Sequence, residues 1–423
     1  MKEDLYSDIR PYNDDEIPAA LERIVNDPFF VPAVNFAFPD ADMERIAEVV
    51  RTCKTVEQLQ ERVMYSIIKR IIETSIDNFT FSGVENVEKD KGYLYISNHR
   101  DITLDSFLLQ YALLSNGIPT TATTLGDNLL RSQFVVDICR INRAVRVIRK
   151  TDDIQPREFL QNSMHLAEYI RWYISQGKSM WIAQRNGRTK DGIDATDQGV
   201  LKMVSLNGPE NFVDNFSELN IAPIAISYQY EPCDVQKAIE TTVNQLGGTY
   251  RKGENEDMNS ILYGIRMPKG NVNITICEPI TQEELQECGA LPKAEAYKRL
   301  KEIIDNRIYH NYMLHETNYI AHDILHRSKQ YSSYYTPAAV KKFKERMAYA
   351  EASFMQYGLN LKAAREVYLG IYAGAVDTKI YTSSLEYIFD SFTPAYFAGV
   401  SVLSTHPIYA NKKRVRQNRT PYI

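Results

Sequence analysis

The sequence lacks any long apolar segment. None of its apolar runs approaches the roughly 18 residues that cross a bilayer, and its first residues, MKEDLYSDIRPYNDDEI, lack the apolar core of a signal peptide. It also lacks an excess of basic residues, since 49 Lys and Arg against 54 Asp and Glu give a formal net charge of −5. We therefore expect no membrane span and no nucleic-acid partner, and any anion-binding site must be a local cluster of cations.

Cysteines are few and follow no pattern. The 423 residues include five cysteines and no C-x-x-C pair. An odd number of scattered cysteines is typical of reduced thiols and not of a disulfide framework. We predict a cytoplasmic protein, with a peripheral position at the inner face of the membrane as the alternative.

Two segments bear on that alternative. The segment 55–76 has apolar residues at helical spacing together with Lys69 and Arg70, which suits either a helix packed on a neighbouring domain or an amphipathic helix on a membrane surface. Packing is the favoured interpretation. The basic cluster at 412–419 is interpreted as a solvated terminus, with attraction to anionic lipid headgroups as the less favoured alternative.

Residues 93–114, YLYISNHRDITLDSFLLQYALL, carry the first candidate site. Residues 93–97 predict a buried strand, and Asp105 opens an apolar segment long enough for a helix. His99 is therefore expected at the C-terminal edge of a strand, with a carboxylate in the first turn of the next helix. Such a carboxylate can accept one ring N–H and leave the other nitrogen free to take a proton. A loop hydrogen bond without catalysis is the more common interpretation of a lone His-Asp pair.

The chain divides into three regions by pattern. We predict helices over 1–80, alternating strands and helices over 81–310, and helices again over 311–423. The expected strands are 93–97, 120–124, 144–148, 179–183, 221–228 and 271–277, and the expected helices between and after them include 104–115, 157–176 and 294–308. This alternation predicts an α/β fold with a mixed, mostly parallel sheet flanked by helices. In such sheets ligands collect at the C-terminal edges of the strands, where His99 falls.

Three further segments of the central region follow the His-Asp stretch. Residues 142–150, NRAVRVIRK, are a predicted strand with cations along it and at its end. Residues 181–190, WIAQRNGRTK, are an apolar strand that runs into a turn rich in cations, and 221–226, IAPIAI, are a strand with a proline near its start. Arginine side chains and backbone N–H groups at a strand-end turn bind phosphate oxygens well. Any one arginine alone would be interpreted as a solvent-facing charge, but together they indicate an anion site.

In this order, the four segments resemble the glycerolipid acyltransferase superfamily, which includes the lysophosphatidate and glycerol-3-phosphate acyltransferases. That family shows a strand with N-H-x-x-x-x-D before a helix, a segment ending in arginine, a strand with F-P-E-G-T-R-S or E-G-G-R-S-R-T-G, and an apolar strand with a proline. The matching segments here are SNHRDITLDSFLL, INRAVRVIRK, MWIAQRNGRTKDG and IAPIAIS. The resemblance covers the region 80–310 and leaves the flanking helical regions without a counterpart.

Two features depart from the family pattern. Five residues, not four, separate His99 from Asp105. We align the family aspartate with Asp105 because the apolar helix follows it directly, and Asp101 is the alternative partner. Gln184 replaces the family glutamate of the third segment, and Arg185 replaces its glycine. The amide keeps polarity but loses charge, so the resemblance implies the fold and the reaction class without fixing the acceptor.

The resemblance implies an O-acyltransferase of phospholipid or membrane-lipid biosynthesis. His99, oriented by Asp105, would deprotonate an acceptor hydroxyl that attacks the thioester of acyl-CoA or an acyl carrier protein. The acceptor would be glycerol 3-phosphate, lysophosphatidate or a related lipid. The residues that would bind it are Arg149, Gln184, Arg185, Arg188 and Lys190. Pro223 would shape the pocket wall, and the resemblance implies no metal and no cofactor beyond the acyl thioester co-substrate.

Two other functions are weighed against this one. His322 and His326 lie one helical turn apart and could ligate zinc in a hydrolase. The glutamate of an H-E-x-x-H motif is missing, however, and Asp323 stands in its place, so interface or surface histidines are the favoured interpretation. A non-catalytic lipid- or partner-binding protein on the same fold is the other alternative. His99 and the cationic strand ends argue against it.

Overall fold

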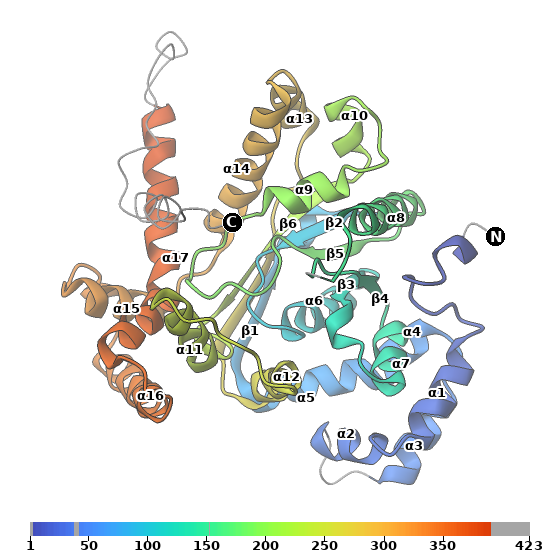
Figure 1. Cartoon of the computed structure of the whole chain (residues 1–423), viewed down its shortest axis with the longest axis horizontal. Coiled ribbons are helices and arrows are strands. Elements are labelled where there is room, and N and C mark those ends of the chain that lie inside the picture. Colours follow the sequence, from blue (N-terminus) through green and yellow to red (C-terminus); the bar gives the residue numbers. More distant parts are fainter. Residues whose placement is uncertain (1–2, 38–41, 152, 391–423) are drawn as a thin grey trace. The chain divides into compact units, whose positions relative to one another are not determined.

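The computed structural model describes residues 3–37, 42–151 and 153–390 of the chain (Figure 1). Contacts group Met1–Lys379 into one compact unit and Ile380–Ile423 into a second. The basic cluster at 412–419 therefore lies outside the described residues. The division into regions 1–80, 81–310 and 311–423 stays a prediction.

A seven-stranded mixed sheet forms the centre of the larger unit. Its strands are β1 (Ile76–Ser82), β2 (Leu94–Ser97), β3 (Ala122–Gly126), β4 (Ala144–Val147), β5 (Met180–Ala183), β6 (Ile221–Tyr228) and β7 (Gly270–Ile276). Their order across the sheet is β1-β7-β6-β2-β5-β3-β4. Only β6 and β7 pair antiparallel, and every other neighbouring pair is parallel. The predicted mixed, mostly parallel sheet is confirmed.

Helices cover both faces of the sheet (Figure 1). Strand residues alternate between the faces, so Leu94 and Ile96 of β2 enter one core while Tyr93 and Tyr95 enter the other. The first core contains residues of α8 (Pro156–Ser175), α9 (Gln198–Val204), α10 (Phe212–Ser217), α13 (Gln282–Gly289) and α14 (Lys293–Asn311). The second contains residues of α5 (Tyr65–Ser75) and α6 (Leu104–Ser115), with α12 (Glu256–Arg266) packed at its margin. With apolar cover on both sides, the central strands are continuous buried runs.

Two helical groups flank the sheet. The N-terminal group consists of η1 (Glu3–Tyr6), α1 (Ile17–Asn26), α2 (Phe30–Ala37), α3 (Met43–Arg51), α4 (Val56–Leu59) and the π-turn η2 (Gln60–Met64), and it packs on α7 (Gln133–Ile141). The C-terminal group consists of α15 (Glu316–His326), η5 (Ser332–Tyr334), α16 (Pro337–Gln356) and α17 (Leu361–Asp390), and it packs on α11 (Asp234–Gln245). Short 3₁₀ turns η3 (Val84–Asn86) and η4 (Asp127–Leu129) complete the described elements.

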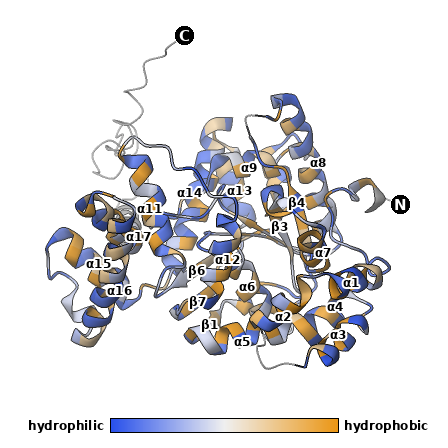
Figure 2. Ribbon diagram, turned by 60° about the horizontal axis from the view of Figure 1, so that its bottom comes forward, coloured by the Kyte–Doolittle hydropathy of each residue, from blue (hydrophilic) through white to orange (hydrophobic). Residues whose placement is uncertain are grey.

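The amphipathic helix at 55–76 packs inside the protein. Figure 2 shows hydrophobic and hydrophilic residues alternating along the helices. Ile68 and Ile71 of α5 are buried in the core beneath β1, while Lys69 and Arg70 face solvent. The favoured interpretation of this segment is therefore confirmed. Among the described helices, none combines the length and apolar character needed to cross a membrane.

All six predicted strands are present, but the sequence did not predict β1. Its segment IDNFTFS begins at the C-cap of α5 and is largely solvent-accessible, with only Ile76 buried. An edge strand of this kind lacks the continuous apolar run by which the central strands were predicted. It is held by pairing with β7, which lies nearly 200 residues further along the chain.

His315 forms the N-cap of α15 and is 6% exposed. The backbone N–H of Asn318 donates to the His315 carbonyl at 2.9 Å, and the Asn318 side chain accepts the His315 N–H at 2.7 Å. Burial lowers the pKa of His315 from 6.5 to about 4. The folded protein therefore holds this imidazole neutral at a pH where the unfolded chain already binds a proton.

His315→Asn should reduce the loss of stability in acid. The unfolded state binds a proton at His315 that the folded state does not. Between pH 6.5 and pH 4 this residue therefore lowers the free energy of unfolding of the wild-type protein by up to about 3 kcal/mol. Asparagine is a good N-cap that does not titrate. Urea unfolding at pH 7.5 and pH 4.5 measures the difference, and an identical pH dependence in both proteins would contradict it.

Candidate active site

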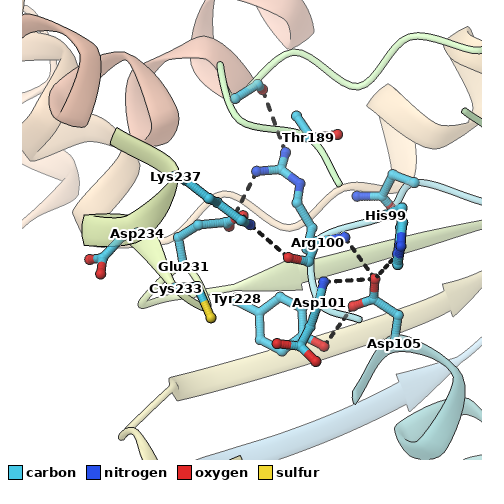
Figure 3. A network of polar contacts seen from close by, with 12 residues as sticks. His99, Arg100, Asp101, Asp105, Thr189, Tyr228, Glu231, Cys233, Asp234 and Lys237 are labelled. Carbon is cyan, nitrogen blue, oxygen red and sulfur yellow. Dashed lines mark hydrogen bonds and ion pairs between the residues drawn. The ribbon is translucent and has the colours of Figure 1, made fainter. Parts of the chain in front are cut away.

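His99 stands at the carboxyl end of β2, next to Asp105 of α6. Asn98 directly follows the strand. Its side-chain Nδ2 donates to the carbonyl of Ile226 at 2.8 Å, and its side-chain Oδ1 accepts the N–H of the same residue at 2.8 Å. This pairing continues the ladder between β2 and β6 and fixes the chain just before the histidine. The Nδ1 atom of His99 then lies 2.9 Å from Oδ2 of Asp105 (Figure 3).

Asp105 is 1% exposed and accepts hydrogen bonds from four groups. The backbone N–H groups of Arg100 and Asp101 donate to Oδ2 at 2.6 and 2.9 Å, and the Tyr228 hydroxyl donates to Oδ1 at 2.9 Å. Burial, together with the charge of Asp105, raises the pKa of Tyr228 well above its usual value, so the phenol remains a donor. Since an ionised carboxylate only accepts, the fourth donor is the Nδ1–H of His99. This assigns the tautomer and leaves Nε2 as the basic nitrogen.

Asp101, the alternative partner of His99, instead binds backbone N–H groups at the start of α6. Its Oδ1 accepts the backbone N–H groups of Thr103 and Leu104 at 3.0 and 2.9 Å, at the start of α6. A side-chain oxygen in this position satisfies N–H groups that have no partner within the helix. The five-residue spacing thus accommodates a helix cap between the histidine and its carboxylate, and Asp105 is the residue that contacts His99.

The imidazole of His99 is partly open to solvent. Its side chain is 15% exposed, and Nε2 makes no hydrogen bond within the described part of the chain. The ring packs edge-on against Trp181 of β5, with 5.9 Å between ring centroids. A partly exposed imidazole with a fixed tautomer and a free Nε2 has the geometry of a general base.

A network of buried charges supports the loop that carries His99 (Figure 3). The guanidinium of Arg100 donates to Asp194 at 2.6 Å and to Glu231 at 3.2 Å, and Lys237 donates to Glu231 and to the Arg100 carbonyl at 2.6 Å each. These four side chains are each no more than 4% exposed. Two cations and two carboxylates therefore neutralise each other in the interior, and each is hydrogen-bonded.

The same region connects to the C-terminal helices through Asp234. This residue is 0% exposed and accepts hydrogen bonds from Arg346 at 2.8 Å, Tyr368 at 2.8 Å and Tyr372 at 2.7 Å. The Tyr372 hydroxyl also accepts the backbone N–H of Glu231 at 3.2 Å. Helices α16 and α17 are thus attached to the segment that holds Arg100.

Three predicted arginines follow β4 and β5, and β5 is the strand next to β2 in the sheet. The turn after β5 is tied to the loop, because the N–H of Thr189 donates to the His99 carbonyl at 2.7 Å. Arg149, after β4, donates to the side-chain carbonyls of Asn128 at 3.2 Å and Asn186 at 2.8 Å, both neutral. Nη1 of Arg188 is buried with no hydrogen-bond acceptor. Within the described residues, Arg149, Arg185 and Arg188 form no ion pair, so their charges are available to an anion.

The structure places the other three predicted positions differently. Gln184 is 0% exposed, its backbone N–H donates to the Ser97 carbonyl, and its Nε2 lies in the interior without a partner. Lys190 forms an ion pair with Glu240. Pro223 lies inside the sheet opposite Ile96 and is buried. Gln184 is thus enclosed, Lys190 is paired with a carboxylate and Pro223 is part of the sheet, and their predicted contacts with an acceptor stay predictions.

An apolar cavity of about 100 Å³ lies beside this site. It is bounded by α5, α6, β3 and α7, and Ile102, Thr103 and Trp181 are among its lining residues. Ile102 and Thr103 belong to the loop between His99 and Asp105, and Trp181 contacts the imidazole. Cys139 also lines the cavity, and desolvation raises the pKa of its thiol to about 12. This thiol is therefore protonated at neutral pH and is no nucleophile.

Sequence reasoning missed Tyr228, Asp194, Glu231 and Lys237. They lie 94 to 137 residues from the loop whose atoms they bind. No local pattern marks them, since each is a single polar residue whose partner in the loop or at the start of α6 is distant in sequence.

The central part of the chain matches an acyltransferase family model. Residues 78–227 match the family model described as Acyltransferase. This segment runs from within β1 to the second-last residue of β6 and includes His99, Asp105 and the three arginines. Together with the motifs and the sheet, this match supports the assignment of the central domain to the glycerolipid acyltransferase superfamily.

Two further comparisons were made. Among solved structures, the chain is similar to the 1-acyl-sn-glycerophosphate (LPA) acyltransferase PlsC from Thermotoga maritima, with 13% sequence identity and a TM-score of 0.38. That similarity covers 70% of this chain and 95% of that one. A comparison with curated protein sequences gave no match.

Lys237→Met should destabilise the fold strongly. The substitution keeps most of the side-chain volume but leaves Glu231 with one cation fewer in the interior, and such a loss costs about 3 to 5 kcal/mol of unfolding free energy. Lys298→Met is the matched control, because Lys298 is 44% exposed and its ion pairs with Glu295 and Glu302 are 3.9 Å long. It should cost less than about 1 kcal/mol. Equal effects of the two substitutions in chemical unfolding would show that the buried network contributes little.

Proposed function

We propose that the protein is an O-acyltransferase that moves a fatty acyl group from an acyl-CoA or acyl carrier protein thioester to a lipid-precursor hydroxyl. The acceptor carries a phosphate or similar anion, as glycerol 3-phosphate and lysophosphatidate do. Its role would lie in phospholipid or membrane-lipid biosynthesis, with no cofactor beyond the acyl thioester. Contact with the membrane surface would bring it to a lipid acceptor.

The observation that carries this proposal is the arrangement around His99. A buried carboxylate fixes the ring, Nε2 is left free, and arginines without ion pairs among the described residues follow β5 and β4 on the same side of β2. A non-catalytic binding protein would need the cations but would not need an imidazole oriented in this way. The arrangement therefore favours catalysis over that alternative.

The proposed reaction transfers one proton and one acyl group. Nε2 of His99 takes the proton from the acceptor hydroxyl as its oxygen attacks the thioester carbonyl carbon. A C–O ester bond forms and the C–S bond breaks, and the departing thiolate takes the proton back from Nε2. The Asp105 carboxylate stabilises the imidazolium present between these steps, without itself taking the proton.

Arg149, Arg185 and Arg188 would bind the acceptor's anion. Charge-assisted hydrogen bonds from guanidinium groups to phosphate are strong and directional. Nη1 of Arg188 is buried and has no hydrogen-bond acceptor, which is unfavourable in the interior. A phosphate oxygen that reached this atom would supply the missing acceptor. Holding the hydroxyl near the thioester would supply much of the rate.

The apolar cavity beside Trp181 would accept part of the acyl chain. It adjoins the loop that carries His99, so a chain entering there would have its thioester end toward the imidazole. An apolar lining gives no directional contacts and binds hydrocarbon through burial alone.

His99→Ala should lower kcat by about 10²- to 10⁴-fold, the usual contribution of a general base. The matched control is His165→Ala, because His165 is also paired with an aspartate, Asp8, at 3.0 Å, but lies on α8 away from the strand ends. Purified proteins are assayed with a labelled acyl thioester, and circular dichroism verifies folding. Turnover by His99→Ala at the wild-type rate would show that this imidazole is not the base.

Arg188→Ala should raise the acceptor KM by about 10- to 100-fold, since a hydrogen bond to a charged group contributes about 1.5 to 3 kcal/mol. The donor KM should change little. Arg45→Ala removes an exposed arginine of α3 and serves as the charge-matched control. The assay compares glycerol 3-phosphate and lysophosphatidate with an uncharged monoacylglycerol. If the substitution leaves the acceptor KM unchanged, or if monoacylglycerol is used equally well, the phosphate-binding role is wrong.

A further inference from the structure

Three potential metal ligands meet between α15 and α17. His322 and His326 lie one turn apart on α15, and Asp377 approaches them from α17. One ligand atom from each residue lies within 4.8 Å of the others. Nε2 of His322 is 3.1 Å from Oδ1 of Asp377, and the two imidazole rings have centroids 4.3 Å apart. The sequence showed the two histidines but could not show the third ligand, which follows them by 51 residues.

The separations suit a transition-metal ion after small side-chain movements. Nitrogen and oxygen ligands lie about 2.0 to 2.2 Å from Zn²⁺ in tetrahedral sites, which puts neighbouring ligand atoms about 3.4 Å apart. The His322–Asp377 pair already has nearly this spacing. The His326 ring is exposed and can turn toward them. Two imidazoles and one carboxylate are a common ligand set for zinc, with the fourth position left to water.

The surroundings of His322 also suit a metal-binding histidine. The residue is 8% exposed, so its imidazole is largely shielded from solvent. Nδ1 is buried with no hydrogen-bond partner and lies 3.9 Å from Oδ1 of Asp323. Metal-bound histidines usually donate their second N–H to a carboxylate in this position. Asp323 is itself held by Tyr335 at 2.9 Å and by the Tyr331 N–H at 3.1 Å.

We propose that His322, His326 and Asp377 bind one divalent transition-metal ion, Zn²⁺ in the first instance, which fastens α17 to α15. The ion would reinforce a junction that already includes the hydrogen bond from Asn318 of α15 to the Tyr372 carbonyl of α17, at 2.9 Å. Tyr372 in turn binds Asp234 of α11. The ligands belong to the C-terminal helices and not to the sheet edge that holds His99, so the metal site is separate from the acyl-transfer site.

Zinc binding to the full chain, purified without an affinity tag, tests this proposal. Metal-free wild-type protein is titrated with Zn²⁺ by calorimetry, and bound zinc is measured by mass spectrometry after dialysis. We expect one zinc ion per chain and a rise in Tm when zinc is added. His326→Ala and Asp377→Asn should each weaken binding by at least about 100-fold and remove the rise in Tm. Both change accessible side chains, so the fold should persist.

His165→Ala is the control, since it removes a histidine that has an aspartate beside it but forms no three-ligand cluster in the described chain. It should bind zinc as the wild type does. The proposal is overturned if wild-type protein binds no Zn²⁺ at micromolar concentrations, or if His326→Ala and Asp377→Asn bind it as tightly as the wild type. In either case the cluster is a hydrogen-bonded His-Asp pair with a second imidazole beside it.

Discussion

The carboxylate of Asp105 is the group on which the candidate site depends. A buried carboxylate is unfavourable unless its oxygens are satisfied, and here four donors satisfy them. Two of these donors are the backbone N–H groups of the residues directly after His99. One side chain therefore fixes the tautomer of the imidazole and the path of the loop that carries it. Tyr228 adds a donor from β6, so the sheet, the loop and α6 meet at a single anion.

The loop is held a second time by charges of opposite sign. Arg100 extends from the loop into the interior, where Asp194 and Glu231 neutralise it and Lys237 completes the balance. Directly beside this network, Asp234 binds the tyrosines of α17 and the arginine of α16. The C-terminal helices, which have no counterpart in the family resemblance, are thereby packed against the network that supports the candidate site. A buried network of this kind is costly to leave incomplete, which favours one well-defined arrangement of loop and helices.

Much of the fold could be predicted because its signals are local. The central strands are apolar runs between turn residues, and α6 has an acidic first turn and a terminating Asn-Gly pair. The hydrophobic pattern and the turn residues were therefore sufficient to predict these elements. The edge strand β1 was missed because it is half exposed and depends on pairing with β7. The partnership of His99 and Asp105 was predicted because both residues lie in one loop and the start of one helix. The positions of Gln184 and Lys190 were not, because a turn of alternating polar residues does not reveal which side chains face inward.

The sequence by itself determined the class of fold and the position of His99 at a strand end, and it limited the partner of His99 to Asp105 or Asp101, since these follow from patterns over a few residues. The tertiary structure decided for Asp105. Only the tertiary structure decided which cations remain free, which polar groups hold the loop and which residue joins His322 and His326. These depend on groups brought together from distant parts of the chain. Packing of the sheet and helices, and not sequence spacing, sets the distances between such groups.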